Sequence, residues 1–365
     1  MVRGDFVQDK ITVLVVDDSA FMRKVITDLL QQDERIEVVG TARNGQDALN
    51  KLTTITPSVI TLDVEMPVMD GLVTLRKIMK KKPIPVVMVS SITLQGAENT
   101  VLAMEYGAVD FITKTSGAIS LDIYKIKDEL IEKVILAAQS KVNNFMKNAR
   151  KDLINSIHSK DSHKSGTSYQ FRADSRKKVV AIGTSTGGPK ALQEVLTKIP
   201  SAINAPILVV QHMPAGFTKS LANRLNSLCS IEVKEAEDGE IIKCGVAYIA
   251  PGGSHLNVKK IGTTLAVQLN QLSPRNGHRP SVDVLFESLA DLSNYSILTV
   301  VMTGMGADGS QGLIKLKKQC NTYSIAEAKE SCIVFGMPRA AIKTNQVDEV
   351  VHLKKISMRI SELVT

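Results

Sequence analysis

The chain has 365 residues, of which 44% are hydrophobic, and its mean hydropathy is near zero. This length accommodates two ordinary domains. No apolar run approaches the roughly 18 residues of a membrane span, and the N-terminus lacks the apolar segment of a secretory signal. The four cysteines form no C-x-x-C pair, which argues against a zinc site or a redox dithiol. We therefore expect a soluble cytoplasmic protein with reduced thiols and no membrane insertion.

The formal net charge of +8 is concentrated in one segment. Residues 137–178 contain ten Lys/Arg and three Asp/Glu, a surplus of seven positive charges, and few apolar residues follow Ile157. Such a composition is typical of a solvated linker. We therefore expect a first domain over 1–136, a basic linker over 137–177 and a second domain over 178–365. Because the remainder is nearly neutral, the charge does not indicate a nucleic-acid partner.

The first domain alternates short β-branched runs with helical patterns. Strands are expected over 11–16, 37–42, 59–62, 86–89 and 110–112. Helices are expected over 21–30, 46–52, 72–79, 99–106 and 123–145. Alternation of this length predicts an α/β domain, a doubly wound parallel sheet with helices on both faces.

Polar side chains follow the expected strands of this first domain. Asp17 and Asp18 close the first strand, and Asp63 closes the third. Carboxylates gathered at one sheet edge repel each other unless a hard cation such as Mg²⁺ is bound. Ser90 and Lys114, at the ends of the next two strands, could bind a phosphoryl group. The alternative for each residue alone is an ordinary cap of the following helix.

Taken together, these residues resemble the receiver domain of two-component response regulators. The motifs that carry the resemblance are Leu14-Val15-Val16-Asp17-Asp18-Ser19, Asp63-Val64-Glu65-Met66-Pro67-Val68-Met69-Asp70-Gly71, Val89-Ser90 and Thr113-Lys114. The resemblance implies that Asp63 accepts a phosphoryl group from a histidine kinase and that Asp17, Asp18 and Asp63 bind Mg²⁺. It also implies that Ser90 and Lys114 are switch residues, with Phe111 at the aromatic switch position.

The second domain continues the alternating pattern. Strands are expected over 179–182, 207–210, 246–249 and 297–302, and helices over 192–197, 221–228, 282–292 and 311–318. The stretch 258–269 alternates like a hairpin. We therefore expect a mixed, mainly parallel sheet in an α/β domain.

A strand-to-turn sequence in the second domain predicts a nucleophile. Residues 183–187, Gly-Thr-Ser-Thr-Gly, place Ser185 after a buried strand in the pattern of a nucleophile elbow. The alternative is a glycine-rich turn that binds phosphate. A serine hydrolase also needs a base and an acid that orients the base. His212 and Asp308 follow the strands 207–210 and 297–302, so we expect them at the same sheet edge as Ser185. The sequence leaves His255, His278 and Asp283 open as other candidates.

The second domain resembles the catalytic domain of chemotaxis protein-glutamate methylesterases, the CheB family. The matching motifs are Ile182-Gly183-Thr184-Ser185-Thr186-Gly187-Gly188-Pro189, Gln211-His212-Met213-Pro214, Ala250-Pro251-Gly252-Gly253-Ser254-His255, Pro280-Ser281-Val282-Asp283 and Thr303-Gly304-Met305-Gly306-Ala307-Asp308-Gly309. The resemblance implies a Ser185–His212–Asp308 triad. We expect oxyanion donors at Thr186 and Met305, and no cofactor for this reaction.

The combined expectation is a phosphorylation-controlled serine esterase. Its substrates would be glutamate γ-methyl esters, and glutamines to be deamidated, on chemoreceptors, and its receiver would mask the catalytic site until phosphorylated. The alternative is a phosphorylation-switched binding protein without catalysis, in which the Ser185 turn binds an anion. A DNA-binding regulator is disfavoured because no helix-turn-helix pattern follows the receiver.

Overall fold

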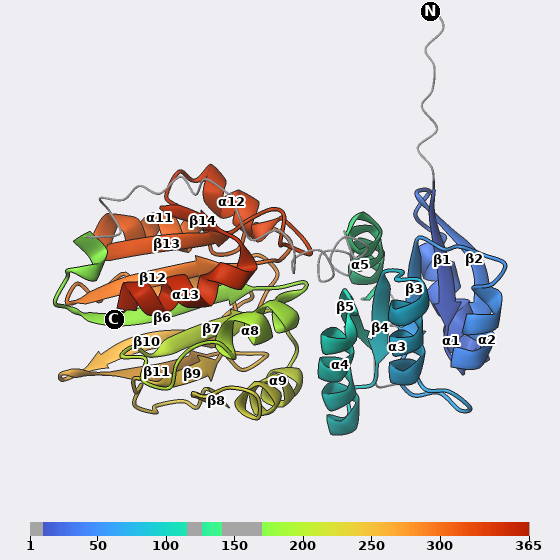
Figure 1. Cartoon of the computed structure of the whole chain (residues 1–365), viewed down its shortest axis with the longest axis horizontal. Coiled ribbons are helices and arrows are strands. Elements are labelled where there is room, and N and C mark those ends of the chain that lie inside the picture. The colour runs from blue at the N-terminus through green and yellow to red at the C-terminus, as the bar shows by residue number, and fades with distance from the viewer. Residues whose placement is uncertain (1–9, 115–125, 141–169, 365) are drawn as a thin grey trace, which may run out of the picture. The chain divides into compact units, whose positions relative to one another are not determined.

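The computed structural model describes residues 10–114, 126–140 and 170–364, which form two compact units (Figure 1). Most of the linker predicted over 137–177 lies outside the described residues, as do parts of the helix predicted over 123–145. Within the described ranges, no helix has both the length and the apolar character needed to cross a membrane. Each unit is described below by itself.

The first unit contains a five-stranded parallel sheet in the order β2-β1-β3-β4-β5. Its strands are β1 (Ile11–Val16), β2 (Ile36–Ala42), β3 (Val59–Asp63), β4 (Val86–Ser90) and β5 (Asp110–Thr113). Its helices are α1 (Ala20–Leu30), α2 (Gly45–Lys51), α3 (Gly71–Lys81), α4 (Leu94–Tyr106) and α5 (Lys127–Gln139). This arrangement confirms the predicted doubly wound fold.

Side-chain caps fix where several of these helices begin. Ser19, Asn44 and Asp70 each accept a hydrogen bond from a backbone N–H in the first turn of α1, α2 or α3. Helix α4 begins five residues before the predicted range because Thr93 caps it by accepting the N–H of Gly96. The capping residue Ser19 therefore starts α1 directly after the acidic residues that follow β1, whereas Asp70 starts α3 eight residues after Asp63.

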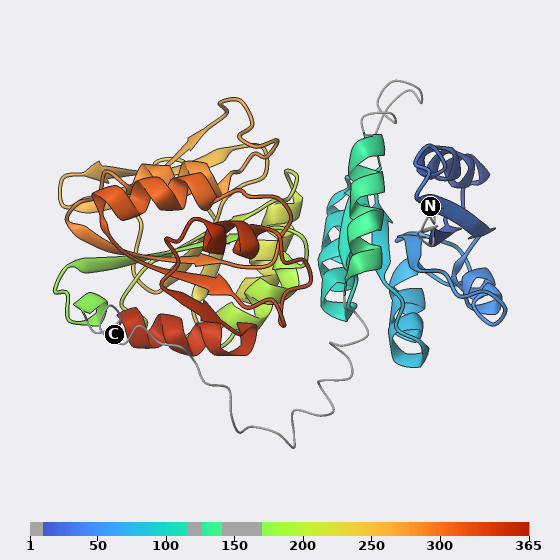
Figure 2. The same ribbon diagram turned by 90° about the horizontal axis from the view of Figure 1, so that it is seen from above.

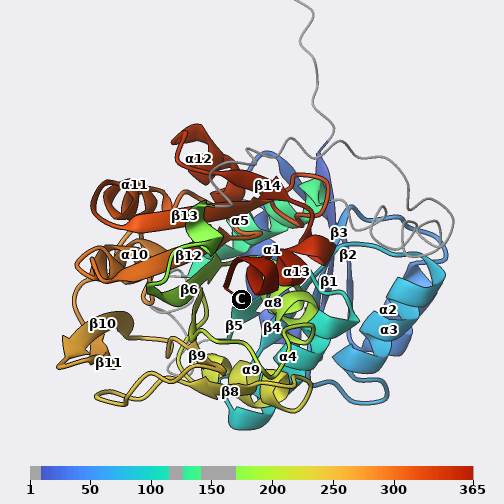
Figure 3. The same cartoon turned by 60° about the vertical axis from the view of Figure 1, so that its left-hand side comes forward.

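The second unit contains a seven-stranded sheet in the order β14-β13-β12-β6-β7-β9-β8, in which every described pairing is parallel. Its strands are β6 (Lys177–Thr184), β7 (Ile207–Gln211), β8 (Glu232–Glu235), β9 (Val246–Ile249), β12 (Tyr295–Val301), β13 (Asn321–Glu327) and β14 (Glu349–Val351). Its helices are α8 (Gly188–Leu196), α9 (Phe217–Asn226), α10 (Val282–Leu289), α11 (Ser310–Gln319), α12 (Met337–Lys343) and α13 (Leu353–Val364). Helices α10, α11 and α12 cover one face, and α8, α9 and α13 cover the other (Figure 2, Figure 3).

The predicted hairpin exists, but the prediction that it makes the main sheet mixed is wrong. Strands β10 (His255–Ile261) and β11 (Thr264–Asn270) pair antiparallel in a separate two-stranded sheet. This hairpin packs against α10 instead of adding to the edge of the parallel sheet. Its alternating buried residues, such as Leu256 and Val258, therefore contribute to the core beneath the main sheet.

The order of the strands sets the position of the candidate site. Strand β6 lies between β7 and β12, and the chain passes from β6 to β7 on one side and returns to β12 on the other (Figure 3). Residues 179–184 of β6 are all buried. In open parallel sheets, ligands bind beyond the carboxyl ends of the strands at such a reversal of strand order. The segments that follow β6, β7 and β12 are therefore expected to form the site.

Candidate active site

Ser185 is the first residue after β6, in a turn that leads into α8. Its N–H donates to the carbonyl of Thr303 at 3.0 Å, and its carbonyl accepts the N–H of Gly188 at 2.7 Å. Gly187 has a φ of 78°, a left-handed conformation that favours glycine. The Ser185 residue is half-buried, and its hydroxyl makes no hydrogen bond within the part of the chain that the structure describes. Hydrogen bonds of the Ser185 backbone therefore hold the turn in place, and the Ser185 hydroxyl takes no part in them.

Gln211, the last residue of β7, ties this turn to the neighbouring strand. Its Oε1 accepts the Thr184 hydroxyl at 2.7 Å, and its Nε2 donates to the carbonyl of Ser185 at 3.1 Å. A Cβ at Gly188 would lie 1.8 Å from both Gln211 Oε1 and Thr184 Oγ1, so only glycine fits there. The sequence analysis missed Gln211, although a polar residue ending an apolar strand is a usable signal.

His212 and Asp308 are brought together as predicted. The Nε2 atom of His212 lies 2.8 Å from Asp308 Oδ2, and the two side chains are only 5% and 1% exposed. The Nδ1 atom of His212 is buried and has no hydrogen-bond partner among the described residues. An Asp308 carboxylate that accepts from Nε2–H leaves the lone pair on Nδ1, which can then take a proton. No hydrogen bond joins Ser185 to His212 in the described chain.

Asp308 is held as a carboxylate by a dense set of donors. It accepts hydrogen bonds from the Ser281 hydroxyl, from the backbone N–H groups of Val282 and Asp283, and from the Asn276 amide. Burial opposes ionisation, but the hydrogen bond and charge of His212 and these backbone N–H groups hold the pKa of Asp308 well below its usual range. Asp308 can therefore orient His212 without taking its proton.

The three residues that the sequence left open as alternatives, Asp283, His255 and His278, are not members of the buried His212–Asp308 pair. Asp283 accepts from the N–H of Gly312 at 2.7 Å and from Asn276 at 2.9 Å, and burial raises the pKa of its carboxyl. His255 is buried, with Nε2 3.2 Å from the carbonyl of Ser273. His278 stacks on His212, with ring centroids 3.8 Å apart and an angle of 14° between the ring planes. Asn276 and this stacking contact are parts of the site that the sequence did not reveal.

The segment after β12 contains Met305, whose N–H is predicted to be an oxyanion donor. Gly304 packs so closely that a Cβ there would lie 2.8 Å from Ser185 Cβ. The next residue, Met305, has a backbone N–H that makes no hydrogen bond to another backbone group in the described ranges. Thr186, the other predicted donor residue, has a carbonyl that accepts the Thr303 hydroxyl at 2.9 Å.

A buried carboxyl that sequence reasoning missed lies beside this segment. Glu327 ends β13, is fully buried, and accepts the N–H of Thr303 at 2.8 Å through Oε2. Burial raises the pKa of Glu327 to about 7, although the Thr303 amide and the side chains of Ser331 and Cys332 oppose the rise. No apolar periodicity marks this residue, because it lies in a strand where polar side chains are buried.

The raised pKa of Glu327 predicts a pH-dependent loss of stability. The unfolded chain releases this proton near its ordinary pKa of 4.5, whereas the folded chain keeps it up to about pH 7. The free energy of unfolding should therefore fall with rising pH across this window, by roughly 3 kcal/mol. Glu327→Gln should make this slope shallower in denaturant titrations between pH 4 and 8, most clearly above pH 6, where Asp63 with its pKa of about 6 contributes less. The exposed neighbour Glu330 provides the control, since Glu330→Gln should keep the slope. An unchanged slope in Glu327→Gln would contradict the prediction.

In the first unit, the predicted acidic residues gather at the carboxyl edge of the sheet. Carboxylate oxygens of Asp17, Asp18 and Asp63 all lie within 4.8 Å of one another. Lys114 Nζ lies 2.8 Å from Asp63 and 3.0 Å from Asp17. Burial raises the pKa of Asp63 to about 6, although Lys114 opposes the rise. The buried carboxylates of Asp17 and Asp63 and the exposed carboxylate of Asp18 provide oxygen ligands of the kind that hard cations prefer.

The two predicted switch residues differ in their present contacts. Lys114 contacts the acidic cluster, whereas the Ser90 hydroxyl donates to the carbonyl of Gly96 at 3.0 Å. Phe111 is buried in this structure, with Lys133 Nζ 5.2 Å from the centroid of its ring.

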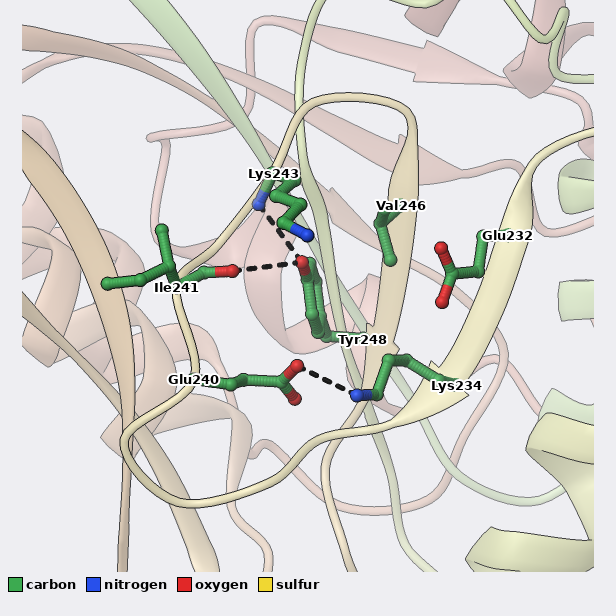
Figure 4. Close-up of a pocket in the computed structure, with 7 residues that line it drawn as sticks. All are labelled: Glu232, Lys234, Glu240, Ile241, Lys243, Val246 and Tyr248. Carbon is green, nitrogen blue, oxygen red and sulfur yellow. Dashed lines mark hydrogen bonds and ion pairs between the residues drawn. The ribbon is translucent and has the colours of Figure 1, made fainter.

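A separate cavity of about 340 Å³ lies at β8 and β9 (Figure 4). Its polar groups pair with one another: Lys234 donates to Glu240 at 2.9 Å, and the Tyr248 hydroxyl accepts the N–H of Lys243 at 3.0 Å. Glu232 and Val246, which also line it, begin β8 and β9. None of the residues that line this cavity belongs to the site described above.

Comparisons with known proteins cover both units. A family model described as CheB methylesterase matches residues 180–360, and one described as response regulator receiver domain matches residues 13–122. A protein of Halalkalibacterium halodurans named protein-glutamate methylesterase/protein-glutamine glutaminase is 58% identical over 350 residues, covering 96% of this chain and 97% of its own length. The chain belongs to the CheB methylesterase family.

Two further CheB relatives support this membership. The protein of the same name from Bacillus subtilis is 49% identical and covers 97% of this chain and 98% of its own length. The crystal structure of the CheB methylesterase catalytic domain of Thermotoga maritima aligns with a TM-score of 0.50 and 45% identity, over 51% of this chain and 98% of that domain. The predicted two-domain family resemblance is therefore confirmed.

Proposed function

We propose that this chain is a phosphorylation-activated serine esterase that hydrolyses glutamate γ-methyl esters on chemoreceptors and deamidates glutamines there. The observation that carries the proposal is the buried His212–Asp308 pair, which leaves Nδ1 without a hydrogen-bond partner among the described residues and follows β7, the strand paired with the one that ends before Ser185. The names of the full-length relatives support the same pair of activities. Chemoreceptor glutamates lie in the cytoplasm in this proposal, where the enzyme acts.

Ser185, His212 and Asp308 act as a unit in the proposed acylation. The Ser185 hydroxyl attacks the ester carbonyl carbon, and its proton passes to Nδ1 of His212. Asp308 keeps the other ring proton on Nε2 and stabilises the imidazolium. The N–H of Met305 and an N–H in the Ser185–Thr186 turn stabilise the developing oxyanion. Collapse of the tetrahedral intermediate transfers the proton from Nδ1 to the departing methanol.

Deacylation reverses these proton movements. Water attacks the acyl carbon and gives a proton to Nδ1, and the Ser185 oxygen then leaves and recovers that proton. The products are free glutamate and the starting enzyme. A glutamine substrate follows the same steps with ammonia as the leaving group, and neither reaction requires a cofactor.

The first unit is proposed to regulate this chemistry. Asp63 accepts a phosphoryl group from a chemotaxis histidine kinase, and Asp17, Asp18 and Asp63 hold the Mg²⁺ ion that neutralises phosphoryl charge when bound. The phosphoryl oxygens would recruit Ser90 and Lys114, and Ser90 would exchange its present bond to Gly96 for one to a phosphoryl oxygen. The resulting receiver conformation is proposed to uncover the Ser185 site.

Methanol release from methylated receptor, with and without acetyl phosphate and Mg²⁺, tests both parts of this proposal. The unmodified chain should release methanol, and the phosphodonor should raise the rate several-fold. Asp63→Asn should abolish that rise while keeping the basal rate, because the variant cannot be phosphorylated there. Asp70→Asn, which keeps the cap of α3 in the same loop, serves as the matched control and should respond normally.

Three outcomes would contradict the proposal at different points. No methanol from the unmodified chain would favour a binding protein over an esterase. A phosphodonor response retained in Asp63→Asn would refute the assigned phosphorylation site. A fragment of residues 177–365 no faster than the resting full-length chain would refute masking by the receiver and leave the esterase assignment intact.

A further inference from the structure

The carboxyl of Glu327 contacts the segment that carries the catalytic groups after β12. Strand β13 pairs with β12, with Ala326 opposite Val301, so Glu327 extends one residue beyond this last pair. Its Oε2 accepts the N–H of Thr303, and its Oε1 is buried without a hydrogen-bond partner in the described chain. Thr303 lies past the end of β12, where the ladder of the sheet no longer provides an acceptor for its N–H. A buried N–H without an acceptor is costly, and Glu327 provides that acceptor.

Thr303 connects Glu327 to the turn that holds Ser185. The Thr303 carbonyl accepts the N–H of Ser185 at 3.0 Å. Its hydroxyl donates to the carbonyl of Thr186 at 2.9 Å and accepts the N–H of Val334 at 3.0 Å. All three polar groups of this one residue are therefore fixed, and two of them fix the backbone of the turn.

The same contacts determine where Met305 lies. Gly304 follows Thr303, donates its N–H to the carbonyl of Val334 at 3.1 Å, and packs directly against Ser185. Met305 comes next, so a shift of Thr303 displaces the proposed oxyanion N–H and the nucleophile turn together. Displacements of about 1 Å in such groups can cost on the order of 100-fold in rate.

We propose that Glu327 is a positioning residue for ester hydrolysis, which holds Thr303 so that the Ser185 turn and the Met305 N–H are aligned. The inference rests on the proposed esterase function and extends it to a residue that touches neither substrate nor the reacting atoms. The required property is an oxygen acceptor at the reach of a glutamate side chain. Both the protonated and the ionised carboxyl offer such an oxygen, and so does the amide of glutamine.

Two conservative substitutions test separately whether the length of the Glu327 side chain or its ionisable group is required. Glu327→Gln keeps the length and an acceptor oxygen but removes the ionisable group. Glu327→Asp keeps the carboxyl but withdraws it by one methylene group from Thr303. In the full-length chain, with methanol release as the assay, Glu327→Gln should retain kcat within about threefold. Glu327→Asp should lose roughly tenfold to 100-fold in kcat, while KM stays within about twofold.

A second buried glutamate in the same sheet is the matched control. Glu349 lies on the edge strand β14, opposite Ile325, where it binds Arg359 at 2.9 Å and accepts the Tyr323 hydroxyl at 3.0 Å. Glu349→Asp should lower the thermal unfolding midpoint and leave kcat within about twofold at a temperature where the protein is folded. This contrast distinguishes alignment of the site from a general loss of stability.

The proposal is overturned if Glu327→Asp has wild-type kcat, if its loss appears in KM alone, or if Glu327→Gln falls as far as Glu327→Asp. If Glu327→Asp does not fold, Glu327→Gln still tests the proposal. A kcat below a tenth of wild type for Glu327→Gln would refute the claim that an acceptor oxygen at this side-chain length is sufficient. Failure of the esterase function itself is a separate result, since the unmodified chain would then release no methanol.

Discussion

Ser185→Ala is expected to lower methanol release by on the order of 10⁴-fold or more while the protein stays folded. The Ser185 hydroxyl makes no hydrogen bond in the described chain, and the turn is held by backbone bonds to Thr303 and Gly188 that alanine retains. Loss of a covalent nucleophile removes the acyl-enzyme route entirely and leaves only binding and oxyanion stabilisation. The measurement is kcat on methylated receptor, with circular dichroism as the check on folding.

The control for this substitution is Ser201→Ala, since Ser201 is exposed and lies in the loop between α8 and β7. Its kcat should equal that of the unmodified chain. A Ser185→Ala variant that kept a tenth of the activity would show that another group is the nucleophile.

His212→Ala is expected to be about as damaging as Ser185→Ala, because Nδ1 is the group that moves the proton in both half-reactions. Asp308→Ala should be less damaging, by on the order of tenfold to 100-fold, because Asp308 orients the ring and does not transfer the proton. The Ser185→Ala/His212→Ala double variant should be no slower than either single variant, since residues that act as a unit are not additive.

The thermal midpoint must be measured alongside these rates. Asp308 accepts bonds from Ser281, Val282 and Asp283, so its removal leaves buried donors unpaired and lowers stability. His212→Ala removes one ring from the contact with His278 and should lower the midpoint less. Equal rates for Asp308→Ala and the unmodified chain would contradict an orienting role.

Apolar runs and turn residues predicted most of the elements around the site, and the elements they missed are strands β8, β13 and β14 and helices α12 and α13. Residues 207–210 and 246–249 are apolar strands that the structure confirms within one residue. Strand β13 was missed because Ser324 and Glu327 are fully buried there, and their polarity hides the strand from hydrophobic periodicity. The short strand β14, only three residues long, gives too little periodicity to recognise.

The same distinction holds for the site. Ser185, His212 and Asp308 each follow a recognisable strand, and parallel pairing then places strand ends at one edge. Gln211 contacts Ser185 across 26 residues of sequence, and Asn276 contacts Asp308 across 32 residues. Glu327 contacts Thr303 across 24 residues. Such contacts depend on loop conformations that no local pattern encodes. The prediction of a mixed main sheet was wrong for the same reason. The sequence indicates the hairpin β10–β11 but not whether it pairs with the main sheet.

The catalytic groups differ in the kind of structure that supports them. Ser185 follows the central strand of a seven-stranded sheet, whereas Asn276 and His278 reach Asp308 and His212 from a loop whose residues 271–277 are exposed. Amide protons of a central strand exchange with solvent at close to the global unfolding free energy, and those of exposed loops exchange through small local openings. Local opening of this loop should therefore break the contacts of Asn276 with Asp308 and of His278 with His212, while strand β6 before Ser185 stays folded. Warming should therefore diminish catalytic competence over a range in which the sheet is still folded.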